Sequence, residues 1–127
     1  MARQAIFPPG RPRPVPPYSP GIRFGNLLFT AGAVGSDING KIPEDISAQT
    51  RNTFENLKAV LSAAGSGLDK VLKVTVFLTD MRDFQAMNEV YRTYFSGDLP
   101  ARSTVGVSAL ARPELHVEIE MIAHVPD

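Results

Sequence analysis

Hydrophobic and polar residues alternate most regularly near the end of the chain. From 115 to 125 the odd-numbered positions are apolar, and the even-numbered positions include His116, Glu118, Glu120 and His124. Because successive side chains of a strand point to opposite faces, this pattern predicts a strand with one apolar and one ionisable face. Solvent, a cleft or a subunit interface are the alternatives for what the ionisable face contacts.

Other segments have strand patterns as well. Residues 70–79 are rich in β-branched residues and alternate in polarity, and residues 102–109 also read as a strand. Near the start, 22–32 and 34–42 are strand-like, and Asn39-Gly40 is the strongest short hairpin signal in the chain. We therefore expect a β-meander to open the fold.

Two segments have helical periodicity. Apolar residues recur at helical spacing over 46–64, after the helix-start residue Asp45, and the run stops at Gly65. A second helix is predicted to begin at Asp80 or Asp83, with a stripe of core residues: Phe84, Met87, Tyr91 and Tyr94. The order βββ-α-β-α-ββ predicts an α+β fold, a mixed sheet with two helices packed on one face.

Composition narrows the class of protein. A chain of 127 residues that is 43% hydrophobic fits one domain with a single core. Thirteen Lys and Arg balance thirteen Asp and Glu, which disfavours nucleic acid and anionic membranes as partners. With no cysteine, the chain has no disulfide, thiolate nucleophile or thiolate metal site. No signal-like or membrane-spanning apolar run is present, so a cytoplasmic location is expected.

A proline-rich leader precedes the patterned part of the chain. Residues 8–20 hold seven of the eleven prolines and should be extended. The segment is either a flexible surface arm or a rigid one that lays Tyr18 against a pocket, and composition does not choose between them. We expect a leader over 1–16 and a domain over 17–127.

Arg102 and Glu118 are the candidates for chemistry. Arg102 is either a surface cation or a planar fork that binds a carboxylate through two hydrogen bonds, and Glu118 is either solvated or positions a water. His116 and Glu118 lie about 6.6 Å apart along a strand, which disfavours a shared metal. A hairpin with its loop near Arg112 would place Arg102 opposite residue 122, roughly 13 Å from Glu118. The two side chains would then meet only across a symmetric interface.

Six motifs together resemble the RidA/YjgF family of reactive-intermediate (enamine/imine) deaminases. They lie in matching order, and the similarity extends over about residues 17–125: PPYSPG, NLLFTAG, GLDKVLKVTVFLTDMRDF, MNEVYRTYF, PARSTVGV and LHVEIEMIAHV. The resemblance implies a chorismate-mutase-like α+β fold and a homotrimer whose sheets form a central barrel, with clefts between subunits.

The resemblance also implies roles for single residues. Arg102 would bind the substrate carboxylate, and Glu118 would position or activate the attacking water. The remaining residues implied at the cleft are the side chains of Tyr18 and Asn88 and the backbone of Gly32 and Thr104. The implied reaction is hydrolysis of 2-enamine or 2-imine carboxylates, such as 2-aminoacrylate, to 2-keto acids and ammonia. This activity, like that of a 2-iminobutanoate/2-iminopropanoate deaminase, needs no metal or organic cofactor.

The chain departs from the family pattern beside Gly32. Ala31 and Ala33 stand where the family commonly has serine and glutamine, which removes a hydroxyl and an amide. We therefore expect a deaminase whose substrate differs from, or is larger than, the usual substrate of the family. A non-catalytic trimer that binds small carboxylates is an alternative function, and an endoribonuclease is a less favoured one because the chain lacks a basic, aromatic-interleaved stripe.

Overall fold

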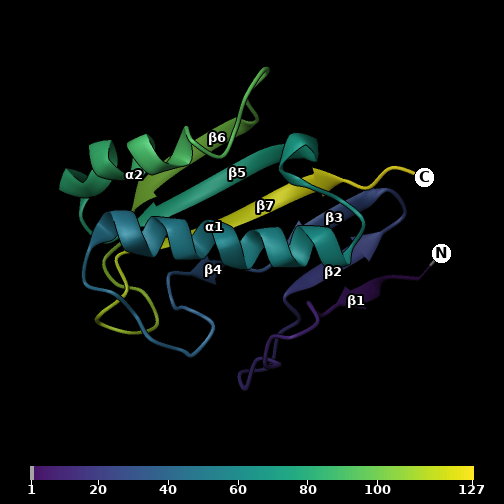
Figure 1. The fold of residues 1–127 in the computed structure, drawn as a ribbon, viewed down its shortest axis with the longest axis horizontal. Helices are drawn as coiled ribbons and strands as arrows, with labels where there is room; N and C mark the ends of the chain where they lie inside the picture. Colours follow the sequence, from purple (N-terminus) through teal and green to yellow (C-terminus); the bar gives the residue numbers. More distant parts are fainter. Residues whose placement is uncertain (1) are drawn as a thin grey trace.

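Two helices cover one face of a seven-stranded mixed sheet in this computed structural model, which describes residues 2–127 (Figure 1). The predicted α+β class, with both helices on one face, is confirmed. The helices are α1 (Ile46–Ala63) and α2 (Phe84–Tyr91). The strands are β1 (Gln4–Ile6), β2 (Gly21–Phe24), β3 (Leu27–Thr30), β4 (Ala33–Val34), β5 (Val71–Leu78), β6 (Ala101–Gly106) and β7 (Val117–His124).

The last two strands do not form the expected hairpin. The sheet order is β1-β2-β3-β7-β5-β6, so β5 separates β6 from β7. Strands β5 and β6 are parallel, with Val74 opposite Arg102, whereas β5 and β7 are antiparallel, with Phe77 opposite Glu118. The reason is the connection through α2, because a helical crossover returns the chain parallel to the strand it left. The prediction that Arg102 lies opposite residue 122 in a β6–β7 hairpin is therefore wrong.

The opening meander is present, but its turn lies elsewhere. Strands β1, β2 and β3 pair in order, and the β2–β3 turn uses Gly25 with a positive φ of 62°. At Asn39-Gly40 there is a turn, but no strand follows it. The Asp37 carboxylate accepts hydrogen bonds from the backbone N–H groups of Asn39 and Lys41, each at 2.9 Å. These local bonds replace a strand ladder, so the predicted strand over 34–42 is wrong beyond Val34, the last residue of β4.

Part of the leader belongs to the sheet. Residues 4–6 form β1 along the edge of β2, and Ile6 is buried. The sequence pattern did not indicate this strand, because three residues are too few for alternation to be recognised. The division into a leader over 1–16 and a domain over 17–127 stays a prediction.

The core lies between the sheet and α1. Phe54, Leu57 and Leu61 of α1 are fully buried against the sheet. The apolar positions of β7 are buried as predicted, including Val117 and Ile119. The opposite face of the sheet, called the open face below, therefore carries the even-numbered side chains of β7. None of the helices in residues 2–127 is long and apolar enough to cross a membrane.

Candidate functional site

Arg102 is held by α2 on the helix-covered side of the sheet. Its Nη1 donates to Oδ1 of Asn88 at 2.7 Å, and its guanidinium carbon lies 4.7 Å from the ring centroid of Tyr91. The amide and the aromatic ring fix the position of the guanidinium plane. Because an arginine has five N–H donors, this geometry leaves donors for a ligand with two oxygens.

Two buried hydroxyls lie in the same region. Thr104 Oγ1 and Tyr91 Oη are buried and have no hydrogen-bond partner within residues 2–127. Thr104 is two residues from Arg102 on β6, so both side chains point to the helix-covered side. Buried polar groups are normally paired, so these hydroxyls are available to bond to a ligand, a water molecule or a neighbouring chain. We call Arg102, Asn88 and Thr104 the Arg102 half-site.

Tyr91 was expected only in the core. Its ring does pack against Phe54 and Phe95, with ring centroids 5.5 Å and 4.9 Å away, but it also contacts Arg102. Burial raises the pKa of the Tyr91 hydroxyl, and the charge of Arg102 opposes that rise. The spacing Asn88-x-x-Tyr91 places both residues on one helix face, and this signal could have linked Tyr91 to Arg102.

Glu118 lies beside an irregularity in the sheet. Phe29 pairs with Ile122 and Ala33 pairs with Ile119, so three residues on one side oppose two on β7. The hydroxyl of Thr30 accepts a hydrogen bond from the Met121 backbone N–H at 2.9 Å, in place of a ladder bond. Bulges of this kind bend the strand and change the direction of the chain, and here the bulge places Gly32 over β7.

Gly32 makes room for the Glu118 carboxyl group. A Cβ at Gly32 would lie 2.7 Å from Cδ of Glu118, closer than real side chains approach. The absence of a side chain at residue 32 therefore lets the carboxyl group pack against its backbone. Burial raises the pKa of Glu118, and the nearby charge of Glu120 adds to the rise. Such a carboxylate is a better proton acceptor than a solvated one.

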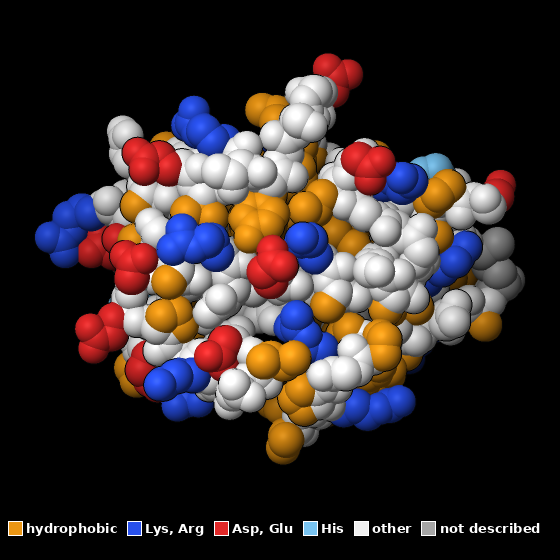
Figure 2. All heavy atoms as spheres, in the orientation of Figure 1, with side chains coloured by type: hydrophobic (Ala, Val, Ile, Leu, Met, Phe, Trp, Pro, Cys, Tyr) orange, Lys and Arg blue, Asp and Glu red, His pale blue; other side chains and the backbone are white. Residues whose placement is uncertain are grey.

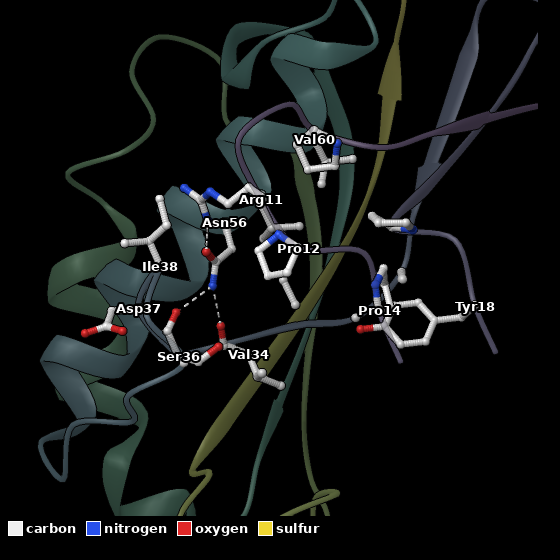
Figure 3. Close-up of a pocket in the computed structure, with 17 residues that line it drawn as sticks. Arg11, Pro12, Pro14, Tyr18, Val34, Ser36, Asp37, Ile38, Asn56 and Val60 are labelled. Carbon is white, nitrogen blue, oxygen red and sulfur yellow. Dashed lines mark hydrogen bonds between the residues drawn. The ribbon is translucent and has the colours of Figure 1, made fainter. Parts of the chain in front are cut away.

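Tyr18 and Gly32 line the same cavity. The cavity has a volume of about 240 Å³ and lies between the leader and α1 (Figure 3). Tyr18 is half-exposed, at 51%, so its ring is only partly packed by its own chain. We call Tyr18, Gly32 and Glu118 the Glu118 half-site.

The two half-sites do not meet within one chain. Arg102 points to the helix-covered side, whereas Glu118 alternates with the buried Val117 and Ile119 and points to the open face. Val74 and Phe77 of β5 pair with Arg102 and Glu118, so the two residues are offset by three positions, about 10 Å, along the strands. Across the sheet, β6 and β7 are two strand spacings apart, about 9.5 Å. The expected separation holds, although the hairpin that suggested it does not exist.

The other ionisable residues of β7 form no metal cluster. Within residues 2–127 no three His, Asp or Glu side chains lie close enough together to hold a metal ion. Glu120 and His124 alternate with buried positions, so they share the open face with Glu118.

Comparisons with known proteins agree with this fold. A family model described as endoribonuclease L-PSP matches residues 9–125. A RutC family protein of Pyrococcus horikoshii is 49% identical over 124 residues, which cover 96% of this chain and 98% of that protein. The structure of RidA from an Antarctic Psychrobacter is 38% identical, with a TM-score of 0.90 and coverage of 96% and 99% of the two chains. The structure of E. coli TdcF with bound serine is 36% identical, with a TM-score of 0.90 and coverage of 97% and 99%. The chain therefore belongs to the endoribonuclease L-PSP family, which is the RidA/YjgF family that its motifs resemble.

Proposed function

We propose that the chain forms a homotrimer in which the Arg102 half-site of one protomer faces the Glu118 half-site of the next. The open face supports this assembly, because it carries large apolar side chains that the helices do not cover. Phe24, Phe29 and Val105 are exposed by 48%, 43% and 42%. Apolar side chains grouped on one face are typical of a surface that another chain covers. The expected trimeric barrel would cover them.

We propose that the resulting cleft hydrolyses 2-imine or 2-enamine carboxylates to 2-keto acids and ammonia. The observation that carries this proposal is the Arg102 fork, fixed by Asn88 and Tyr91 beside the unpaired hydroxyl of Thr104. This geometry suits a carboxylate, which accepts two parallel hydrogen bonds from a guanidinium. TdcF, the structural relative solved with bound serine, holds a ligand with such a carboxylate.

The reaction needs orientation and a proton acceptor. An enamine substrate first tautomerises to the imine, as a proton moves from its nitrogen to its terminal carbon. Arg102 holds the substrate carboxylate, so the C=N carbon lies opposite Glu118 of the neighbouring protomer. Glu118 takes a proton from a water molecule as the water oxygen bonds to that carbon. The proton held by Glu118 and the proton of the new hydroxyl then pass to the nitrogen. The C–N bond breaks, ammonia leaves, the carbonyl of the keto acid forms, and Glu118 is ionised again. Desolvation of Glu118 favours its accepting the proton.

A non-catalytic trimer that binds small carboxylates is the second candidate. Ala31 and Ala33 favour it, because neither can supply a hydroxyl or an amide to the reacting atoms. An endoribonuclease, the activity named in the description of the family model, has less support. Figure 2 shows acidic and basic side chains interspersed over the helix-covered face, whereas a nucleic-acid backbone would need a basic stripe.

A coupled assay tests the proposal. A dehydratase generates 2-aminoacrylate in solution, and the appearance of pyruvate is followed with and without this protein. We expect acceleration by the unmodified protein and a loss of about a hundredfold or more in Arg102→Ala, because the carboxylate loses its charged partner. Arg112→Ala is the control, since Arg112 is exposed in a loop and its ion pair within residues 2–127 is with Glu114.

A binding measurement distinguishes the hydrolase from the non-catalytic trimer. No acceleration by the unmodified protein contradicts the hydrolase, as does equal acceleration by Arg102→Ala. If the protein still binds pyruvate in an Arg102-dependent manner, the non-catalytic trimer is the better description.

A further inference from the structure

The cavity that contains Tyr18 and Gly32 extends beyond the Glu118 half-site. It runs beneath the leader and over α1, as far as Arg11 and Asn56 (Figure 3). Its volume of about 240 Å³ equals the space of roughly eight water molecules, enough for the side chain of a small metabolite. The walls are largely apolar and include Pro12, Pro14, Val34, Leu57 and Val60.

Arg11 is the basic residue of this cavity, and a chain of hydrogen bonds holds it. Its guanidinium donates to Oδ1 of Asn56. The amide nitrogen of Asn56 donates to the carbonyl oxygens of Val34 and Ser36, each at 2.9 Å. These bonds orient the amide oxygen toward Arg11, and an apolar cavity with a few fixed polar groups is the usual form of a small-molecule site.

Small side chains line the end of the cavity that is nearest to the Glu118 half-site. Ala31 and Ala33 flank Gly32, and all three residues line the cavity. The Glu118 carboxyl group fills the space that a Cβ of residue 32 would occupy. Gly32 is therefore the residue that the cavity and the Glu118 carboxyl group share, and from Gly32 the cavity leads toward Arg11.

The acidic residue of the cavity is engaged in a turn. Oδ1 of Asp37 accepts the backbone N–H groups of Asn39 and Lys41. In Figure 3 its carboxylate points away from the Arg11 guanidinium. A ligand that reaches Arg11 through the cavity therefore meets a cation among apolar walls.

We propose that this cavity is a specificity subsite for a substrate side chain of a few carbons that ends in a carboxylate. The inference rests on the proposed function, and it names the substrate class as 2-imino dicarboxylates. Arg102 of one protomer would hold the first carboxylate, and Arg11 of the next would hold the second. An arginine suits this role because its remaining donors can form charge-assisted hydrogen bonds with the distal carboxylate.

Equilibrium binding tests the subsite without turnover. The probes are the keto acids 2-oxoglutarate and 2-oxopentanoate, which share a five-carbon chain and differ at the far end. Each is titrated calorimetrically into the unmodified protein. We expect 2-oxoglutarate to bind about tenfold or more tightly, because a charge-assisted hydrogen bond contributes at least that factor. Arg11→Gln should bring the ratio close to one.

A matched variant controls for charge. Arg13→Gln removes the same charge from an exposed leader residue outside the cavity, where Arg13 lies over the Phe7 ring, and should keep the ratio. Equal affinities in the unmodified protein, a ratio that Arg11→Gln leaves unchanged, or no binding of either keto acid overturns the subsite.

A cavity-filling variant tests the same subsite without changing Arg11. Ala33→Leu should weaken 2-oxopentanoate relative to pyruvate by about tenfold, because the added branch occupies the space next to Gly32. An unchanged ratio overturns the subsite.

Turnover separates this inference from the function on which it rests. An Arg11-dependent preference without any imine hydrolysis contradicts the proposed hydrolase and supports the subsite as a binding site. Hydrolysis that is equally fast for 2-iminoglutarate and 2-iminopentanoate supports the hydrolase and overturns the subsite.

Discussion

Glu118 has its unusual environment because residue 32 has no side chain. The carboxyl group packs against the Gly32 backbone, and burial is the main cause of its raised pKa. A raised pKa changes both what the group does in a reaction and what its charge contributes to stability. The two effects are measured separately.

The pH dependence of the reaction follows from the ionised form. If Glu118 accepts a proton from water, kcat/KM falls as pH decreases through its pKa, which lies above the ordinary 4.5. We expect Glu118→Gln to lose about a hundredfold in kcat/KM and to have no acidic limb. The measurement is kcat/KM from pH 4 to 8, corrected for spontaneous hydrolysis. Retention of the limb in the variant would assign it to another group.

The same shift predicts a pH-dependent stability difference. Because the folded-state pKa is raised, the ionised carboxylate destabilises the folded state, and this cost develops as pH rises above 4.5. Glu118→Gln should therefore have a higher Tm than the unmodified protein at pH 7. The difference should disappear below pH 4.5, where both residues are neutral. Thermal unfolding at pH 4 and pH 7 checks this, and equal Tm values at pH 7 would contradict it.

At the scale of elements, one buried glutamine joins α1 to two loops. Nε2 of Gln49 donates to the carbonyl oxygens of Pro43 and Glu114, and Oε1 accepts the backbone N–H of His116, all at 2.8 Å. Gln49 is fully buried. The contact with residues 114–116 fixes the chain at the entrance to β7, two residues before Glu118.

We expect Gln49→Leu to destabilise the protein by about 3 kcal/mol, because it leaves buried backbone groups without partners. Chemical denaturation measures the change. Thr53→Val is the control: its hydroxyl donates one hydrogen bond, to the Gln49 carbonyl at 2.8 Å, among the residues that the structure describes. Its loss should cost about 1 kcal/mol or less. Equal losses in the two variants would mean that Gln49 does not hold the loops.

The elements themselves could largely be predicted from the sequence. Asp45 was expected to start α1, and its carboxylate accepts the Ala48 backbone N–H at 2.9 Å. The alternation in β7 correctly gave its buried face. The partners of the strands could not be predicted, because alternation reports which face a side chain occupies and contains no information on the neighbouring strand. The hairpin predicted at Asn39-Gly40 is absent for a local reason, because the Asp37 carboxylate accepts the backbone N–H groups of Asn39 and Lys41 that a strand ladder would otherwise use.

At the scale of the whole molecule, the division of the site between protomers has a direct test. Arg102→Ala and Glu118→Gln are each expected to be inactive, but a mixed trimer can combine an intact Arg102 with an intact Glu118 from its neighbour. Random mixing of equal amounts after unfolding and refolding should restore about one quarter of the sites, because each interface needs one particular pair of variants. The measurement is imine hydrolysis by the mixture, with each variant refolded alone as the control.

Failure of the mixture to regain activity, although mass measurement shows mixed trimers, would contradict a site shared between protomers. A monomeric mass for the unmodified protein in solution would contradict the homotrimer itself.

The sequence by itself determined the helices, the faces of the main strands and the residues that bear chemistry, because these depend on local periodicity and residue type. Only the tertiary structure decided that β5 lies between β6 and β7, since strand pairing joins residues far apart in the chain. That pairing places Arg102 and Glu118 on opposite faces. Folding of the leader over α1 likewise formed the cavity between Tyr18 and Arg11, which no local pattern of prolines could specify.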